Sequence, residues 1–134
     1  MYYISEENKA SVSDLHRILV VDDDSDIALT FKKGLQVHGF LVDAFIDPQE
    51  ALSRFKPNYY HLLLIDIRMP NMSGFELYRR IRKKDKNTKV CFITSFHNYY
   101  QSLKENYPEI DSMRLIQKPI EIENLITHII SELN

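Results

Sequence analysis

The sequence predicts a doubly wound α/β domain, a five-stranded parallel sheet with helices on both faces. Short apolar segments alternate with segments whose apolar residues recur at helical spacing, and this alternation runs to the end of the chain. The strand segments are almost continuously apolar, as expected of parallel strands that are buried on both faces. Strand, helix and next strand in this order pair in parallel through right-handed crossovers.

The length and composition are those of one globular domain. The chain has 134 residues, enough to bury a core, and its 27% charged residues are ordinary for a globular protein. A formal net charge of -2 gives no reason to expect binding to nucleic acid or to a membrane surface. The apolar runs are far too short to cross a bilayer, and the first residues lack the pattern of a signal peptide.

Residues 1–15 are polar, without sustained periodicity, and we expect a flexible leader followed by a domain over residues 16–134. The expected strands are 17–21, 40–45, 61–65, 89–93 and the short, mixed segment 112–116. A helix is expected around 98–106, and another along the stripe of Ile122, Leu125, Ile129 and Leu133.

Three further helices have recognisable ends. The first is capped by Asp24 or Ser25 and stops at Gly39, and its apolar face is Ile27, Phe31 and Leu35. The second has the cap, the first-turn proline and the glutamate of a helix start at 47–50, and Pro57 ends it. The third follows Gly74, with Phe75, Tyr78 and Ile81 inward and Arg79, Arg80, Arg82 and Lys83 outward.

Polar residues suited to phosphate chemistry stand where four of the five strands end. They are Asp22 and Asp23 after the first strand, Asp66 after the third, Thr94 and Ser95 after the fourth, and Lys118 after the fifth. Because ligands of a doubly wound sheet bind outside the carboxyl ends of its strands, we expect these side chains to meet on one rim.

The chemistry of this set is complementary. Clustered carboxylates hold together by taking up protons or a cation, and hard carboxylate oxygens suit Mg²⁺. Asp66 is placed as a carboxylate nucleophile, Lys118 offers a charge to a phosphoryl oxygen, and Thr94 offers a hydroxyl. Taken singly, each of these residues is an ordinary cap, turn or surface residue, and Asp24 is better explained as a cap than as a ligand. Their joint placement favours the functional interpretation.

Four stretches of the chain resemble the receiver domain of two-component response regulators, in the family's usual order. They are Val20-Val21-Asp22-Asp23, Leu64 to Pro70 with Gly74, Ile93-Thr94-Ser95, and Lys118-Pro119. The resemblance covers residue 17 to the C-terminus and implies a flavodoxin-like sheet of strand order 2-1-3-4-5.

The resemblance also implies a function and a role for each residue. Asp66 would accept a phosphoryl group from a phosphohistidine of a sensor histidine kinase or phosphotransfer protein. Asp23, Asp66 and the carbonyl of Arg68 would bind Mg²⁺ (or Mn²⁺) directly, and Asp22 would act largely through water. Lys118 would pair with the phosphoryl group, Thr94 would move towards it, and Lys118-Pro119 would be a cis peptide.

A receiver of this kind is a cytoplasmic phosphoacceptor rather than a conventional enzyme, although it catalyses its own phosphorylation and dephosphorylation. We expect a stand-alone receiver whose output runs through surface contacts with a downstream protein, because no output domain follows the last helix. A homodimer through helix four, strand five and the last helix is compatible with the family. We expect neither membrane nor direct nucleic-acid binding.

The sequence departs from the family's pattern in three places. Ser95 is small but polar, Leu115 stands where the family often has an aromatic residue, and the stretch 105–114 with Pro108 lacks the usual Gly-Ala. The acceptor chemistry is untouched, but the switch must differ. We expect movement of the loop 95–100, with Tyr99 or Tyr100 repositioned in place of the aromatic residue.

Two other functions compete with this interpretation. Asp22-Asp23-Asp24-Ser25 has the look of a haloacid-dehalogenase-type phosphatase, with Asp22 as nucleophile and Asp24 as acid/base. Against that function stand the short chain and the better match around Asp66. A receiver-like module that binds partners without being phosphorylated is the other alternative, but such modules typically lose one of the residues that are present here.

The remaining candidates favour structural roles. None of the five histidines has metal-ligand spacing, and His97 is the one nearest the site. The single cysteine, Cys91, is predicted to be a small buried residue and fits a reducing compartment. One tyrosine of each pair, 59–60 and 99–100, is expected to pack, and the basic cluster 79–84 is expected to be a solvated helix face.

Overall fold

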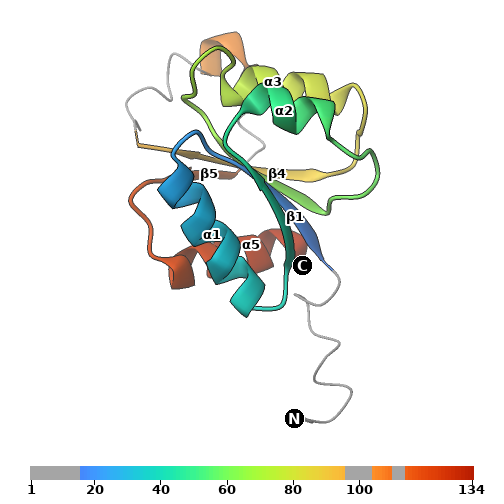
Figure 1. Cartoon of the computed structure of the whole chain (residues 1–134). Coiled ribbons are helices and arrows are strands. Elements are labelled where there is room, and N and C mark those ends of the chain that lie inside the picture. Colours follow the sequence, from blue (N-terminus) through green and yellow to red (C-terminus); the bar gives the residue numbers. More distant parts are fainter. Residues whose placement is uncertain (1–15, 96–103, 110–113) are drawn as a thin grey trace.

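The five-stranded parallel sheet is confirmed in the computed structural model, which describes residues 16–95, 104–109 and 114–134 (Figure 1). Its strand order is β2-β1-β3-β4-β5, as the resemblance implies. The strands are β1 (Arg17–Val21), β2 (Leu41–Phe45), β3 (Leu62–Asp66), β4 (Lys89–Thr94) and β5 (Arg114–Gln117). The register pairs Asp66 with Ile93 and Thr94 with Gln117, so the strand ends form one edge.

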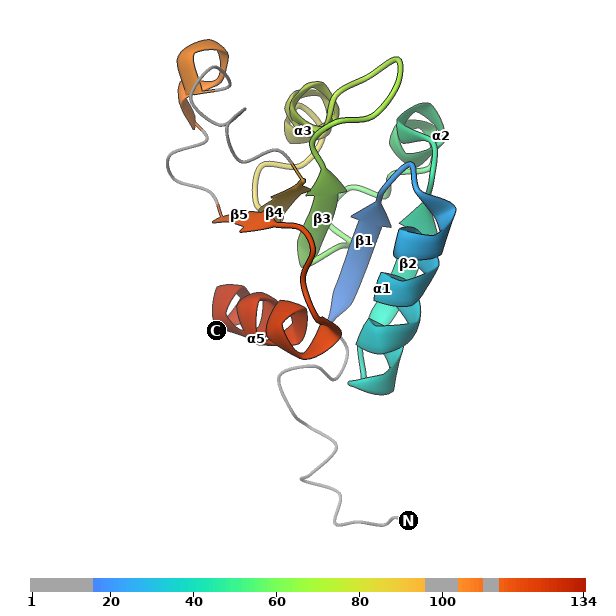
Figure 2. The ribbon, with the colours of Figure 1, turned by 90° about the vertical axis from the view of Figure 1, so that its left-hand side faces the viewer.

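The helices cover both faces of this sheet (Figure 2). On one face lie α1 (Ser25–Val37) and α5 (Ile122–Leu133), and on the other lie α2 (Pro48–Ser53) and α3 (Gly74–Arg82). Residues 104–106 form a helical turn, and the rest of the helix expected around 98–106 falls outside the described residues.

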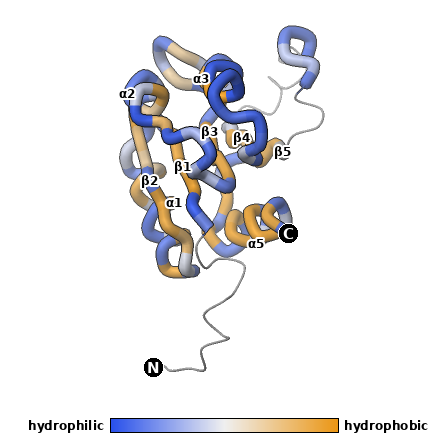
Figure 3. Tube along the Cα trace, turned by 90° about the vertical axis from the view of Figure 1, so that its right-hand side faces the viewer, coloured by the Kyte–Doolittle hydropathy of each residue, from blue (hydrophilic) through white to orange (hydrophobic). Residues whose placement is uncertain are grey.

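The buried side chains form two apolar layers, one on each face of the sheet, and the apolar strands run through the centre of Figure 3. Successive residues of β3 alternate between the layers: Leu63 and Ile65 pack with α2 and α3, whereas Leu62 and Leu64 pack with α1 and α5. Both sets are buried, which explains why the strand reads as a continuous apolar run.

The expected helix ends are formed by local hydrogen bonds. The side chain of Asp24 caps α1 by accepting from the amides of Asp26 and Ile27, so Asp24 rather than Ser25 is the cap. After α1, Gly39 adopts a φ of 95°, and the amides of Gly39 and Phe40 donate to carbonyls of the last turn. This is the glycine stop that the sequence predicts.

Two details of the prediction are wrong. The helix α2 ends at Ser53 instead of near Pro57, because Arg54 closes its last turn and the chain then turns through Asn58, whose φ is 61°. Arg82 does not point outward. Its guanidinium donates to the carbonyls of Asp85 and Thr88 and lies 5.0 Å from the ring centre of Tyr78, because the carbonyls of the α3–β4 loop need a donor there.

Other boundaries differ by one or two residues. The strands β3, β4 and β5 extend one residue further than predicted, to Asp66, Thr94 and Gln117, and the first two residues of the predicted strand 112–116 lie outside the described residues. Within the described residues, no helix has the length and apolarity needed to cross a membrane.

Gly74 fixes the position of α3 against the end of β3. Its amide donates to the carbonyl of Ile67 at 2.8 Å, and a Cβ atom at this position would overlap the backbone carbonyl of Asp66. The backbone of α3 therefore touches the backbone of the residue that carries the central carboxylate, and only glycine permits this contact.

We expect Gly74→Ala to lower the free energy of unfolding by about 1–3 kcal/mol, because rigid backbone must shift to admit the methyl group. Gly34→Ala in α1 is the matched control. There the new methyl group meets only the side chain of Ile122, which can rotate, and alanine gains up to about 1 kcal/mol of helix propensity. Urea unfolding of both variants tests this, and equal losses would contradict it.

Candidate functional site

The predicted polar residues meet at the carboxyl edge of the sheet. Asp22 follows β1, Asp66 ends β3, Thr94 ends β4 and Lys118 follows β5. Together they line one pocket of about 230 Å³, whose walls are Asp22, Asp23, Asp24, Ile27, Asp66, Arg68, Thr94, Ser95 and Lys118. Every residue that the sequence nominated for catalysis or metal binding therefore lies at this pocket.

Lys118 connects the two buried carboxylates of the pocket. Its Nζ atom lies 2.8 Å from Oδ2 of Asp22 and 3.3 Å from Oδ1 of Asp66. Its backbone amide donates to the carbonyl of Thr94 at 2.7 Å, and the following Lys118-Pro119 peptide is cis, as expected. Burial alone would lower the pKa of Lys118, but the hydrogen bonds and charges of Asp22 and Asp66 outweigh it and raise this pKa.

Three carboxylates crowd the same space. One oxygen atom from each of Asp22, Asp23 and Asp66 lies within 4.8 Å of the others, and Asp22 and Asp66 are buried whereas Asp23 is exposed. Burial and then the negative charge of Asp22 raise the pKa of Asp66 to about 7, and Lys118 opposes them only in part. One lysine therefore leaves the group short of positive charge.

This shortage is what a divalent metal ion would remedy. Carboxylate oxygens are the ligands that Mg²⁺ prefers, and the exposed Asp23 leaves the group open to solvent on one side. Across residues 16–95, 104–109 and 114–134, no other group of three or more His, Cys, Asp or Glu side chains is close enough to hold a metal ion. The donor set fits the expected ion.

Asp22 and Asp24, in the loop between β1 and α1, have different roles. Oδ1 of Asp22 accepts a hydrogen bond of 2.9 Å from the amide of Asp24, which orients the Asp22 carboxylate towards Lys118. Oδ1 of Asp24 accepts from the first amides of α1, as a helix cap. Asp24 is thus engaged in holding the helix, which argues against its role as the acid/base of a phosphatase.

The remaining predictions have mixed outcomes. Cys91 is fully buried in mid-strand, and of the first tyrosine pair Tyr60 is buried and Tyr59 partly exposed, as expected. Leu115 packs against the core layer of α2 and α3. His97, Tyr99 and Tyr100 lie outside the described residues. Ile27, which the sequence did not indicate, is also a wall of the pocket, and its place in the first turn of α1 after Asp22, Asp23 and Asp24 could have suggested it.

The chain matches known proteins over nearly its whole length. The model of the response regulator receiver domain family matches residues 18–130. The response regulator receiver protein CpdR of Brucella abortus is 32% identical over 115 residues, which cover 86% of this chain and 94% of CpdR. Several other relatives are much longer, and the chain spans between 9% of a sensor protein and 50% of a transcriptional regulator among them.

Solved structures show the same fold. A CheY-like receiver domain from Methanospirillum hungatei superposes with a TM-score of 0.78 at 29% identity, over 90% of this chain and 94% of that one. The response regulator TrrA of Thermotoga maritima, solved with Mg(2+)-BeF, superposes with a TM-score of 0.73 at 30% identity, over 89% and 99% of the two chains. By the family model, the relatives and the fold, the chain belongs to the response regulator receiver domain family.

Proposed function

We propose that Asp66 is the phosphoacceptor of a two-component phosphorelay. A carboxylate oxygen of Asp66 attacks the phosphorus of a phosphohistidine on a sensor histidine kinase or phosphotransfer protein, and the phosphorus–nitrogen bond breaks. The observation that carries this proposal is the position of Asp66, at the tip of a buried strand between the carboxylate of Asp22 and the ammonium of Lys118.

The chemistry needs a divalent metal ion, Mg²⁺ or Mn²⁺. Asp23, Asp66 and the carbonyl of Arg68 would hold it directly, and Asp22 would do so largely through water. Bound there, the ion would supply the positive charge that one lysine leaves lacking and would favour the carboxylate form of Asp66 that attacks. The Mg(2+)-BeF complex of TrrA supports this part of the proposal by analogy.

Lys118 and Thr94 would receive the phosphoryl group. In the unphosphorylated protein Lys118 shares its charge between Asp22 and Asp66, and a phosphoryl oxygen bound to Asp66 would compete for the same ammonium group. Thr94 is buried at the end of β4 and lines the pocket, so its hydroxyl is within the region that the phosphoryl group would occupy.

Phosphorylation would then alter a surface that binds a downstream protein. We place this domain in the cytoplasm, where its single, buried cysteine stays reduced. A homodimer through the region of β5 and α5 stays a prediction, because most of the helix expected before β5 falls outside the described residues. The same is true of the expected movement of the loop 95–100.

The described residues suggest a different element for the switch, an aromatic cluster beneath the site. The ring of Phe75 stacks on Tyr107 at 4.9 Å and meets the ring of Phe92 at 4.5 Å. Phe75 follows Gly74, whose backbone touches Asp66, and Phe92 lies two residues before Thr94 on β4. The end of β3, which carries Asp66, and the end of β4, which carries Thr94, are therefore both connected to Tyr107 through the ring of Phe75.

Arg79 fastens Tyr107 and its neighbours to α3. The guanidinium donates to both carboxylate oxygens of Glu109, at 3.0 and 3.2 Å, and to the carbonyl of Asn106 at 3.2 Å. It also lies 4.4 Å from the ring centre of Tyr107. We propose that this latch, formed by Arg79, Tyr107 and Glu109, passes a change at Asp66 to the segment 104–109.

The acceptor assignment predicts that Asp66→Asn abolishes labelling by acetyl phosphate, because the amide cannot form an acyl phosphate. Asp24→Asn is the control, since asparagine still caps α1 and the substitution lies on the same pocket. Mass spectrometry of the two variants shows whether each carries the phosphoryl label and on which residue. Label retained in Asp66→Asn would refute the assignment, and label located on Asp22 would revive the phosphatase function.

The metal assignment predicts that Asp23→Ala weakens Mg²⁺ binding by about tenfold or more, because a ligand and its charge are both removed. Asp26→Ala removes the same charge from the first turn of α1, outside the acidic cluster, and should have a much smaller effect. Calorimetric titration with Mg²⁺ measures both. Labelling that proceeds normally in EDTA would contradict the requirement for the ion.

The raised pKa of Asp66 predicts how stability depends on pH without metal. A carboxyl whose pKa is about 7 in the fold and near 3.8 when unfolded binds more protons in the fold, so its stabilising contribution is lost as the pH rises through 7. Relative to wild type, Asp66→Asn should gain roughly 1–4 kcal/mol of unfolding free energy between pH 5 and pH 8.

Urea unfolding in EDTA at the two pH values checks this, with Asp47→Asn as the control. Asp47 caps α2 away from the cluster, and asparagine replaces it as a cap. Excess Mg²⁺ should remove most of the difference between wild type and Asp66→Asn in how the unfolding free energy depends on pH. If the two proteins differ in unfolding free energy by the same amount at pH 5 and pH 8, Asp66 is ionised over this whole range and the prediction is wrong.

The latch predicts that Arg79→Met interrupts the signal without harming the acceptor. Addition of Mg²⁺ and beryllofluoride to the wild type should shift the amide resonances of Tyr107 and Glu109, and Arg79→Met should largely abolish these shifts while phosphorylation stays normal. Arg80→Met is matched in exposure but removes a pair with Glu76 inside α3, so it should behave as wild type. Equal shifts in all three proteins would rule out the latch.

A further inference from the structure

The end of α3 and the loop that follows it carry a high concentration of positive charge. Of the 17 lysines and arginines of the chain, seven lie between residues 79 and 89, although the chain as a whole has a net charge of -2. They are Arg79, Arg80, Arg82, Lys83, Lys84, Lys86 and Lys89. Because this segment is strongly basic, the rest of the chain is net acidic, and the molecule is electrically polarised.

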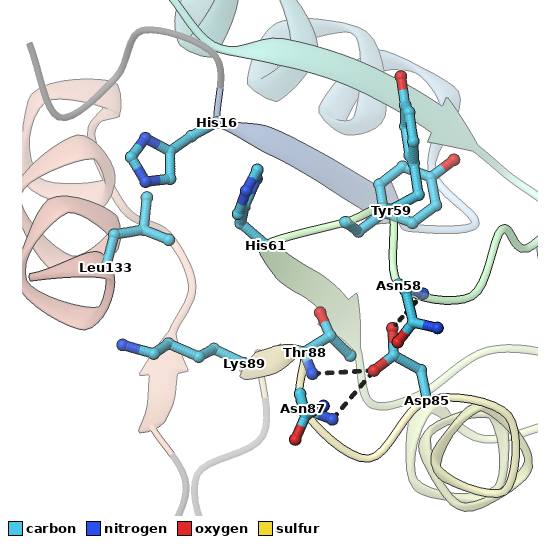
Figure 4. Close-up of a pocket in the computed structure, with 10 residues that line it drawn as sticks. His16, Asn58, Tyr59, His61, Asp85, Asn87, Thr88, Lys89 and Leu133 are labelled. Carbon is cyan, nitrogen blue, oxygen red and sulfur yellow. Dashed lines mark hydrogen bonds between the residues drawn. The ribbon is translucent and has the colours of Figure 1, made fainter. Parts of the chain in front are cut away.

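The one acidic residue of this segment, Asp85, does not neutralise its surface. Asp85 is 3% exposed, and its carboxylate accepts hydrogen bonds from the amides of Asn58, Asn87 and Thr88, at 2.9, 2.9 and 3.2 Å (Figure 4). These bonds join the loop before β3 to the loop before β4. The basic side chains at the end of α3 therefore project from a backbone that is already fixed before any partner arrives.

Four of the seven cations have partners inside the protein. Arg79 and Arg80 form ion pairs with Glu109 and Glu76. The guanidinium of Arg82 donates to two carbonyls of the loop before β4. The ammonium groups of the exposed lysines differ among themselves, and that of Lys89 donates to a carbonyl at the end of α5, towards which it points in Figure 4. These four charges are accounted for by contacts within the domain.

The remaining three cations, Lys83, Lys84 and Lys86, form what we call the lysine patch, and all three are exposed. The ammonium of Lys86 donates to the carbonyl of Arg82 at 3.2 Å and keeps two further N–H groups for a ligand. The side chains of Lys83 and Lys84 make no hydrogen bond or ion pair with any residue that the structure describes. The lysine patch is therefore positive charge that the described part of the fold does not use.

A structural role at the helix end explains only part of the lysine patch. Cations in the last turn interact favourably with the helix dipole, and Lys86 also binds a carbonyl of that turn. Lys83 and Lys84, however, follow Arg79 and Arg80 by four residues, a spacing at which like charges repel each other. The arginines of these pairs each have a glutamate, so the two lysines are the charges in excess.

A short acidic segment matches the lysine patch in spacing and in extent. Side chains three or four residues apart on a helix lie about 5–6 Å from one another. Carboxylates at alternate positions of an extended chain lie roughly 7 Å apart, so two or three of them can meet the three ammonium groups. A nucleic acid fits less well, because its line of phosphates extends beyond the patch and meets the net acidic remainder of the domain.

We propose that the lysine patch docks an acidic segment of a partner protein, in which aspartates or glutamates stand at alternate positions. The helix α3 begins against Asp66 and runs away from it, so Lys83 lies about 13 Å further along the helix axis than Gly74. The lysine patch and the acceptor site can therefore be occupied together, and the proposal stands whether or not Asp66 is phosphorylated.

The test is a fluorescence-anisotropy titration of the full chain at low salt with a labelled peptide of alternating glutamate and glycine. A lysine–glycine peptide and an oligothymidylate of the same length are titrated in parallel. The acidic peptide should bind with saturation, added salt should weaken the binding, and the amide resonances of residues 83–86 should shift in NMR spectra. The lysine–glycine peptide should not bind.

Three double variants assign the binding to the lysine patch. Lys83→Gln with Lys84→Gln should weaken binding about tenfold, because two exposed ion pairs are lost, whereas Lys83→Arg with Lys84→Arg should stay within about twofold of wild type. Lys32→Gln with Lys33→Gln, the matched control, removes two adjacent lysines of α1 and should also stay within about twofold.

Three results would overturn the proposal. The first is binding of the acidic peptide that does not saturate. The second is an equal loss in the two glutamine variants, which would show that only the total charge matters. The third is tighter binding of the oligothymidylate than of the acidic peptide at residues 83–86, which would identify a nucleic-acid contact instead.

Discussion

The repulsion among buried carboxylates, and its partial relief by Lys118, is the constraint around which the rest of the site is arranged. Asp22 follows β1, Asp66 ends the adjacent strand β3, and both are buried, so their charges are poorly screened by water. The sheet holds them together because β1 and β3 pair along buried apolar residues, and Lys118 reaches them from the end of β5. A fold held by its core can keep a charge imbalance at its edge and use it to attract a cation.

The backbone of α3 extends this constraint into the core. Because residue 74 has no side chain, α3 begins in direct contact with Asp66, and the next residue, Phe75, enters the aromatic cluster with Phe92 and Tyr107. A displacement of the Asp66 backbone would therefore press on the first residues of α3. Through Phe75 it would reach closely packed rings, which tend to rearrange between discrete positions rather than deform.

The sequence predicted the elements whose signals are local, and missed those that depend on distant partners. Helix caps such as Asp24 and strand ends such as Asp66 follow from neighbouring residues and from the rule that parallel strands share a carboxyl edge. Tyr107 was missed because its contacts with Phe75 and Arg79 cross about thirty residues of sequence. Arg82 is a different case, because the carbonyls of Asp85 and Thr88 that it binds are close in sequence, but helical periodicity does not show that the loop after α3 folds back over this side chain.

Two aspartates of this chain show why burial alone does not make a reactive carboxylate. Asp66 and Asp85 are 5% and 3% exposed, and burial by itself would raise the pKa of both. For Asp85 the hydrogen bonds from the backbone amides of Asn87, Asn58 and Thr88 outweigh burial, so its pKa is lowered. Its carboxylate holds two loops together through these bonds. Asp66 has instead a second carboxylate and a shared lysine beside it, and its pKa rises. Asp66 is therefore the carboxylate whose charge the fold compensates only in part, and it lies at the edge of the sheet where the strands end, which is the position that the proposed phosphoacceptor role requires.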